Sequence, residues 1–276
     1  MVVTVGFFDG VHIGHRRVLR SLVEKGGDAA AVVTFWPHPR IVLGQNAEGL
    51  SLLTSFQEKE AMLHDCHISD VRCVEFTPEF ASMDAESFIK EYLIGQIGCT
   101  SLVLGYDNRF GSDGLDTVQI AQLCRGMGIT VEVVPPCIVD GFSVSSTRIR
   151  NSLKDGDVAL AARMLGYHYR IDGVASEGSD GKRSGFRTIL VTPCFAQKAV
   201  PREGVYATDV FIQGSRYRGM TFIDNKIYTH IFDYAGTVPD DGISLEFISR
   251  VRGVQHFESD EEMRSTLEMD KHRCFG

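Results

Sequence analysis

The sequence lacks the features that mark membrane, secreted and nucleic-acid-binding proteins. No apolar run approaches the roughly 20 residues that a membrane-spanning helix needs. No basic segment precedes the apolar start MVVTVGFFDG, so we predict no signal peptide. Positive charge is scarce, because 28 Lys and Arg stand against 36 Asp and Glu, for a formal net charge of -8. That balance argues against binding to nucleic acid or to an anionic membrane.

Cysteine pairs with metal-site or redox spacing are also missing. The seven cysteines are scattered, their number is odd, and none forms a CxxC pair. We therefore predict reduced cysteines in a cytoplasmic protein, with no structural zinc site. Internal repeats and low-complexity segments are absent, and nothing in the sequence indicates the oligomeric state.

The first part of the chain alternates strand and helix patterns. Apolar runs of strand length lie at Val2–Phe8, Ala29–Phe35, Val71–Phe76, Ser101–Leu104 and Ile129–Val134. Helical spacing lies between them, for example from His15 to Lys25 and from Phe88 to Ile97, and either Thr54 with Gln57 or Ser55 with Glu58 can cap a helix that follows. This alternation predicts a Rossmann-like α/β domain with a parallel sheet, residues 1–166.

The pattern changes near Tyr167, after two short helical stretches at Thr147–Leu153 and Val158–Leu165. Six short strands then follow, at Tyr169–Ala175, Thr188–Thr192, Gly204–Ile212, Arg218–Phe222, Lys226–Asp233 and Ile243–Val251. Polar turns such as residues 176–185 separate them, and Ser259 with Glu262 signals a final helix. We predict a small antiparallel β-barrel domain with a C-terminal helix, residues 167–276.

The sharpest motif runs from Gly6 to His15, with the sequence GFFDGVHIGH. A strand ends here, glycines permit a tight turn and close backbone approach, and a helix begins. Helix N-termini offer free N–H groups and positive potential, both suited to phosphate. His12 and His15 are one helical turn apart, so both rings can face one anion, and a histidine donor stabilises a pentacoordinate transition state. The alternative is a structural glycine turn with two incidental histidines.

A second motif, Ser143 to Arg150, reads SVSSTRIR. Its hydroxyls can cap the following helix and donate to phosphate, and Arg150 returns to the side of Thr147 with a guanidinium suited to phosphate oxygens. An ordinary serine cap with a solvated arginine is the alternative.

Together, an early HxGH and a late SSTxxR in such a domain resemble the nucleotidylyltransferase superfamily. TFWPHP with Val42-Leu43, LLT with Glu58-Lys59, and Gly105–Gly111 (GYDNRFG, with Asn108 where phenylalanine is usual) narrow the likeness to the bifunctional riboflavin kinase/FAD synthetase family over essentially the whole chain. The rigid aromatic and proline segment from Phe35 to Pro39 suits the flat, apolar faces of a flavin.

The resemblance implies that AMP passes from ATP to FMN, giving FAD and pyrophosphate, with Mg²⁺ as cofactor and only small nucleotides and flavins as partners. His12, His15 and Arg150 would be catalytic. ATP would contact Gly6, Phe8, Asp9, His12, Gly14, His15, Ser145, Ser146, Thr147 and Arg150. Flavin would contact Phe35, Pro37, His38, Pro39, Tyr106, Asp107, Arg109 and Phe110, with core packing as the alternative for Phe35 and Phe110.

The second domain resembles a riboflavin kinase but departs from its motifs. GFPTAN becomes GFRTIL, so Arg187 and Leu190 replace proline and asparagine, and only Thr188 remains of the expected metal site. Tyr228 stands where the catalytic glutamate is expected, and the segment after Gly219 is short. Leucine cannot bind a hard cation, and tyrosine is a poor base at neutral pH. We therefore expect an inactive kinase domain.

Three alternatives remain from sequence: a fully bifunctional enzyme, a nucleotidylyltransferase with another phosphorylated acceptor, and a non-catalytic flavin sensor. The flavin-like segments argue against the second alternative, and the intact HxGH and SSTRIR motifs argue against the third.

Overall fold

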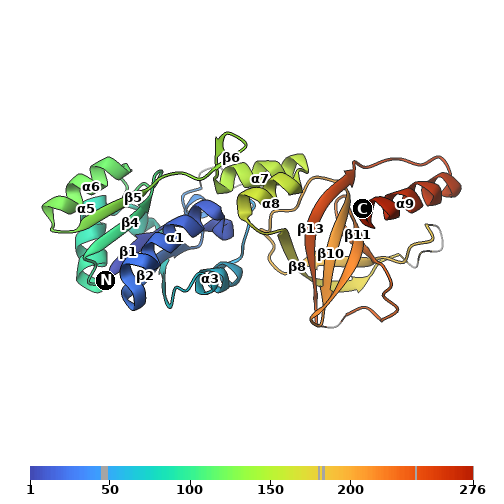
Figure 1. Ribbon diagram of the computed structural model, residues 1–276, viewed down its shortest axis with the longest axis horizontal. Helices are drawn as coiled ribbons and strands as arrows, with labels where there is room; N and C mark the ends of the chain where they lie inside the picture. Colours follow the sequence, from blue (N-terminus) through green and yellow to red (C-terminus); the bar gives the residue numbers. More distant parts are fainter. Residues whose placement is uncertain (45–48, 180, 182–183, 240, 276) are drawn as a thin grey trace. The chain divides into compact units, whose positions relative to one another are not determined.

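The computed structural model describes residues 1–44, 49–179, 181, 184–239 and 241–275. The chain divides into two compact units, Met1–Ser146 and Thr147–Gly276 (Figure 1). This division precedes the two short helices that the sequence places before the barrel, whereas the boundary predicted near residue 166 follows them. The assignment of these two helices to the first functional domain, residues 1–166, stays a prediction. Part of the polar turn predicted at 176–185, residues 180, 182 and 183, lies outside the described residues.

The first unit is built on a five-stranded parallel sheet with the order β3-β2-β1-β4-β5. Its strands are β1 (Val2–Val5), β2 (Ala30–Trp36), β3 (Asp70–Glu75), β4 (Ser101–Gly105) and β5 (Thr130–Val134). The predicted Rossmann-like fold is confirmed. The first strand is shorter than predicted, because the chain leaves the sheet at Gly6 although the apolar run continues through Phe8.

Helices cover both faces of this sheet (Figure 1). On one face, Leu19 and Leu22 of α1 (Ile13–Gly26) and Leu63 of α3 (Phe56–Asp65) pack with Val32 of β2. On the other face, Val33 packs with residues from the π-helix η3 (Phe88–Gln96), which continues α5 (Ala85–Ser87), and from α6 (Thr117–Gly126). The shorter elements are η1 (Asp9–Val11), η2 (Gly27–Ala29), α2 (Pro39–Val42), α4 (Pro78–Ala81), β6 (Ile138–Val139) and β7 (Phe142–Ser143).

Of the two caps considered for α3, the structure forms the one made by Ser55. The hydroxyl of Ser55 accepts from the Glu58 N–H, and the Glu58 carboxylate accepts from the Ser55 N–H. Both partners of the capping box are therefore present, and α3 begins at a fixed residue.

The second unit contains α7 (Ser146–Asp155) and α8 (Val158–Leu165), followed by a closed antiparallel barrel with the strand order β10-β11-β12-β9-β8-β13. Its strands are β8 (Tyr169–Glu177), β9 (Ile189–Pro193), β10 (Gly204–Ile212), β11 (Ser215–Ile223), β12 (Ile227–Ile231) and β13 (Ile243–Arg252). The predicted barrel with a C-terminal helix is confirmed, and each predicted strand overlaps an observed one.

The final helix, α9 (Asp260–Phe275), packs on the outside of this barrel (Figure 1). Cys274 is buried with Val205 and Ala207 of β10. Asp270 is fully buried, and the guanidinium Nε of Arg252 donates to its carboxylate at 2.7 Å. The predicted capping box is half formed, because the Ser259 hydroxyl accepts from the Glu262 N–H but the Glu262 carboxylate accepts from residue 258 instead of residue 259.

All seven cysteines are free thiols, as predicted. Among the described residues, no helix combines the length and apolar character that crossing a membrane requires.

Candidate active site

The turn from Gly6 to His15, here called the histidine turn, has an unusual backbone. Phe8 and Val11 have positive φ values of 56° and 32°, and Gly10 has a φ of 76°. Positive φ is rare for any residue with a Cβ atom, and for a β-branched residue such as Val11 it is an outlier. Such strain clusters at functional sites, and this turn lies at the carboxyl end of β1, the central strand of the sheet.

Glycines in the histidine turn make room for side chains. A Cβ atom on Gly6 would lie 3.1 Å from the ring of Phe8, and one on Gly14 would lie 3.1 Å from the imidazole of His12. The Phe8 ring in turn contacts His15 edge-on, with centroids 5.2 Å apart. Gly6 and Gly14 are therefore required for the placement of the two histidine rings.

His12 and His15 stack at the N-terminus of α1. Their ring centroids are 3.5 Å apart and their planes differ by 14°. His12 is the N-cap residue, and its Nδ1 accepts the backbone N–H of His15 at 3.2 Å. Because Nδ1 accepts, the neutral His12 ring carries its proton on Nε2, which makes that nitrogen a donor.

The pKa of His15 is lowered well below 6.5, first by burial and then by the nearby His12 and Lys59. Its Nδ1 is buried and has no hydrogen-bond partner among the described residues. His15 is therefore a neutral imidazole with one unused polar atom, beside a ring that can donate.

Asp9, predicted to contact ATP, binds a neighbouring loop in this structure. Its Oδ1 accepts from the backbone N–H groups of Leu53 and Thr54 at 2.9 and 3.1 Å, and the Thr54 hydroxyl accepts from the Gly10 N–H at 3.1 Å. The backbone oxygen of Asp9 accepts from the hydroxyl of Ser146 at 2.9 Å. Asp9 thus holds the histidine turn against the Leu53–Thr54 loop. The sequence had indicated Leu53 and Thr54 only as part of the LLT motif, without this role.

The second predicted motif crosses the division between the two units. Ser145 and Ser146 belong to the first unit, and Ser146 is already the first residue of α7. In the second unit, the buried Arg150 donates to the hydroxyl of Thr147 at 3.1 Å, so the two residues share one side of the helix as predicted.

The segment from Phe35 to Pro39, here called the aromatic wall, comprises the last two residues of β2 and the three that follow. Trp36 stacks in parallel with Phe7 at 6.3 Å, and His38 meets the Phe7 ring edge-on at 4.2 Å. Pro37 and Pro39 are half-buried, and His38 caps α2 through its Nδ1. Phe7 thereby connects the histidine turn to the wall, a role that sequence reasoning missed.

Core packing was the alternative left open for two predicted flavin contacts: Phe110 lies in the core, and the half-buried Phe35 packs against it. Phe110 is 5% exposed and packs edge-on against Phe88. Phe35 contacts Phe76, Phe80 and Phe88, with ring centroids 5.7 to 6.5 Å apart. Both rings pack in the cluster formed by one face of the sheet and the helix η3 in this structure.

The other predicted flavin contacts lie on the loop after β4. Tyr106, Asp107 and Arg109 are exposed. Asn108, which stands where phenylalanine is usual, accepts from the Gly105 N–H at 2.6 Å and donates to the Val5 carbonyl at 2.8 Å. Its amide therefore joins the carboxyl ends of β1 and β4, where the strand order reverses and open α/β sheets bind ligands.

In the barrel, two of the altered kinase positions are cross-strand neighbours. Leu190 of β9 and Tyr228 of β12 are directly paired across neighbouring antiparallel strands. The remaining Thr188 hydroxyl accepts from the Ser179 N–H at 2.9 Å. The leucine side chain has no oxygen that could bind a hard cation.

Arg187, where the kinase motif has proline, connects loops of the barrel. Its Nη1 donates to the Gly236 carbonyl at 3.3 Å, and its Nη2 lies 3.6 Å from the Glu177 carboxylate. The carbonyl of Arg187 is 2.6 Å from Nδ1 of His230. Proline could not make the two guanidinium contacts, whereas the carbonyl contact does not depend on the side chain.

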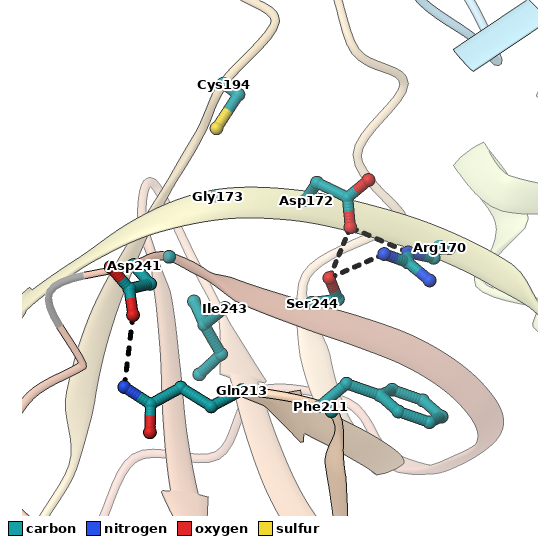
Figure 2. Close-up of a pocket in the computed structure, with 11 residues that line it drawn as sticks. Arg170, Asp172, Gly173, Cys194, Phe211, Gln213, Asp241, Ile243 and Ser244 are labelled. Atoms are coloured by element: carbon teal, nitrogen blue, oxygen red, sulfur yellow. Dashed lines mark hydrogen bonds and ion pairs between the residues drawn. The ribbon is translucent and has the colours of Figure 1, made fainter. Parts of the chain in front are cut away.

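A pocket of about 430 Å³ lies elsewhere on the barrel, and none of its residues was predicted as a site. Figure 2 shows two polar groups around it, with Ile243 between them. Arg170 bonds Asp172 and Ser244 in one group, and Gln213 bonds Asp241 in the other. These polar side chains bond one another, so none of them indicates a ligand.

Comparisons with known proteins agree on one family. The FAD synthetase family model matches residues 1–148, and the riboflavin kinase (flavokinase) model matches residues 165–275. The bifunctional riboflavin kinase/FMN adenylyltransferase of Bacillus subtilis (strain 168) is 32% identical, covering 99% of this chain and 91% of that protein. The protein of the same description from Pseudomonas fluorescens is 31% identical over 98% and 90%.

A crystal structure from Streptococcus pneumoniae, described as a macrolide-efflux protein, has a TM-score of 0.90 at 26% identity and covers 100% of this chain and 93% of that one. The two family models and the curated relatives together match both halves of the sequence. The chain belongs to the bifunctional riboflavin kinase/FMN adenylyltransferase family.

Proposed function

We propose that this protein transfers AMP from ATP to FMN, giving FAD and pyrophosphate. The main observation that supports the proposal is that His12 and His15 stack at the N-terminus of α1. The turn that leads into this helix has a strained backbone and follows the carboxyl end of the central strand. A helix N-terminus with close backbone approach suits a polyphosphate. The match of the FAD synthetase model to this half supports the same reaction.

The work of this site is positioning and charge stabilisation. An oxygen of the FMN phosphate attacks the α-phosphate of ATP, the new P–O bond forms, and pyrophosphate leaves. His12 donates from Nε2 to the non-bridging oxygens, where negative charge increases in the transition state. His15 stays neutral beside it, so the stacked rings do not repel each other. Arg150, Ser145, Ser146 and Thr147 would hold ATP phosphates.

The flavin would lie against the aromatic wall and the exposed loop residues Tyr106, Asp107 and Arg109. Trp36, Pro37 and Pro39 offer rigid apolar surface to the ring system. Phe35 and Phe110 would support this surface from the core.

Mg²⁺ is expected with ATP. The described residues hold no group of three or more His, Cys, Asp or Glu side chains that could bind a metal ion. In such sites the ion is bound chiefly by substrate phosphates and water, with few protein ligands.

The finer part of the proposal is that the barrel does not phosphorylate riboflavin. Leu190 and Tyr228, paired across β9 and β12, together remove the expected metal ligand and the expected base. Riboflavin kinase activity is the second candidate function, because the kinase model matches residues 165–275 and the relatives are described as bifunctional.

One incubation tests both activities. The protein is mixed with ATP, Mg²⁺ and either FMN or riboflavin, and the products are separated by chromatography. FAD and pyrophosphate from FMN, with no FMN or FAD from riboflavin, is the expected result. Absence of FAD at every substrate concentration contradicts the central proposal, and turnover of riboflavin that Thr188→Ala abolishes establishes the bifunctional alternative.

A further inference from the structure

A lysine is buried between the two proposed substrate segments of the first unit. Lys59 of α3 is 1% exposed. Its Nζ donates to the Phe7 carbonyl at 3.0 Å, to the Thr34 hydroxyl at 2.9 Å and to the Phe35 carbonyl at 3.4 Å. An ammonium group has three N–H donors and a neutral amine has two. Three acceptors therefore match the protonated form.

These acceptors belong to different parts of the candidate site. Phe7 lies in the histidine turn, two residues before Asp9. Thr34 and Phe35 lie near the end of β2, and Phe35 is the first residue of the aromatic wall. The Thr34 hydroxyl also donates to the Phe7 carbonyl at 3.2 Å. One side chain thus joins the segment proposed for ATP to the segment proposed for flavin.

The surroundings of the ammonium are aromatic, and we call them the lysine cage. Nζ lies 4.2 Å from the ring centroid of Phe7, 5.5 Å from that of Phe56 and 5.7 Å from that of Trp36. Among the described residues, no carboxylate lies within 4 Å of Nζ. Burying a cation without an ion pair costs more than burying an apolar side chain of the same length. Fold stability alone therefore does not explain a lysine here.

We propose that Lys59 is a positioning residue for adenylyl transfer, whose charged ammonium holds the aromatic wall at a fixed distance from the histidine turn. This inference rests on the proposed function. The spacing matters because the FMN phosphate must reach the α-phosphate in line, and a displacement of about 1 Å between reacting groups costs about 100-fold in rate.

The charge of Lys59 responds to pH near the physiological range. Burial lowers its pKa from 10.5 to about 8, and Cys73 and Asp9 oppose that shift. Three titratable groups act on it or are acted on by it: burial raises the pKa of Cys73 above 9.0, the pKa of His15 is well below 6.5, and Asp9 contributes a carboxylate. His38 also packs edge-on against the Phe7 ring that Lys59 contacts.

The single tryptophan of the chain, Trp36, lies in the lysine cage and reports this titration without any substrate. We expect the emission of Trp36 to change with an inflection near pH 8 in the unmodified protein and to lose that inflection in Lys59→Met. The exposed Lys90→Met is the matched control and keeps it. Thr34→Val removes one acceptor of the ammonium, so the inflection moves to lower pH, which gives a second measurement if Lys59→Met does not fold.

Steady-state kinetics then distinguishes a positioning role of Lys59 in the reaction from a role in fold stability alone. For Lys59→Met we expect kcat for FAD formation to fall about 10- to 100-fold, while the separate affinities for ATP and for FMN change less than about threefold. In the unmodified protein kcat should decline as pH rises through about 8. Lys90→Met should behave as the unmodified protein does.

The outcomes of the two proposals are distinguishable. Failure of the unmodified protein to form FAD contradicts the proposed function. A Trp36 inflection that persists unchanged in folded Lys59→Met, or a kcat for that variant within about twofold of the unmodified protein, overturns the role of Lys59 even when FAD is formed.

Discussion

His12 combines two roles that mutation can separate. Its Nδ1 caps α1, and its Nε2 is the proposed donor to the α-phosphate. We expect both His12→Ala and His12→Asn to lower kcat about 10²- to 10³-fold, as loss of an oxyanion donor does. Asparagine is a good N-cap and alanine is not, so His12→Ala alone should also lose about 1 kcal/mol of unfolding free energy. Steady-state kinetics and urea denaturation measure the two effects.

A different pattern would contradict this assignment. If both variants weaken ATP binding and leave kcat unchanged, His12 contacts only the ground state. If His12→Asn keeps full activity, the ring itself is not required.

Asn108 is expected to stabilise the sheet at the candidate site. Its side chain makes two hydrogen bonds that join the carboxyl ends of β1 and β4 beyond their last paired residues. Asn108→Ala leaves the Gly105 N–H and the Val5 carbonyl without these partners, so we expect a loss of about 1–3 kcal/mol in unfolding free energy by urea denaturation. The exposed Asn151→Ala is the control and should change stability by less than about 0.5 kcal/mol.

The roles of Asn108 and Lys59 could not be predicted from the sequence. A lysine in an amphipathic helix is ordinarily solvated. The burial of Lys59 depends on carbonyls at residues 7 and 35, which only the parallel pairing of β1 and β2 brings together. In contrast, the closeness of His12 and His15 was predicted from their spacing of one helical turn, which is a local property, although the stacking of the rings was not.

At the level of elements, hydrophobic periodicity predicted all five strands of the sheet and all six of the barrel. It failed at the end of β1, where Phe7 and Phe8 continue the apolar run but leave the strand. Phe7 packs against Trp36 and Phe8 packs against His15. It also could not distinguish a flavin contact from a core residue at Phe110, since a ring that supports a pocket and a ring that lines one have the same sequence signal.

The attachment of α9 depends on a buried ion pair. The carboxylate of Asp270 is 1% exposed and bonds Arg252 at 2.7 Å. Arg252→Met leaves that charge buried without its partner, so we expect a loss of about 3–5 kcal/mol. In this variant, the rate of hydrogen exchange at residues 260–275 should increase more than the rate in the barrel strands. Arg273→Met, which removes a 60% exposed side chain 3.9 Å from Asp270, should have little effect, and equal effects of the two variants would contradict this role.

For the molecule as a whole, two lowered pKa values predict how the stability of the first unit varies with pH. The unfolded chain binds a proton to Lys59 below about pH 10.5, whereas the folded protein does so only below about 8. Lys59 therefore makes the unfolding free energy increase with pH between about 8 and 9, below the range in which the buried thiols of this unit, whose pKa values are raised above 9.0, act in the opposite direction. His15 acts in the same direction, so stability falls as pH decreases below 6.5.

Denaturation followed by the emission of Trp36 reports this unit, because the chain has no other tryptophan. Lys59→Met should remove the increase between about pH 8 and 9 and retain the slope below 6.5. A curve that is unchanged in Lys59→Met would show that other groups cause the alkaline slope.

The central position of β1 in the sheet also governs how the protein emerges during translation. Val2 pairs with Ala30 on one side and with Ser101 on the other. The ribosome therefore releases the middle strand first, and that strand has an open, apolar edge until β4 has been synthesised. Nascent chains that stall before Ser101 can assemble only β3, β2 and β1, and they present a free edge to one another. The order of synthesis makes this interval the one in which chaperone protection matters most.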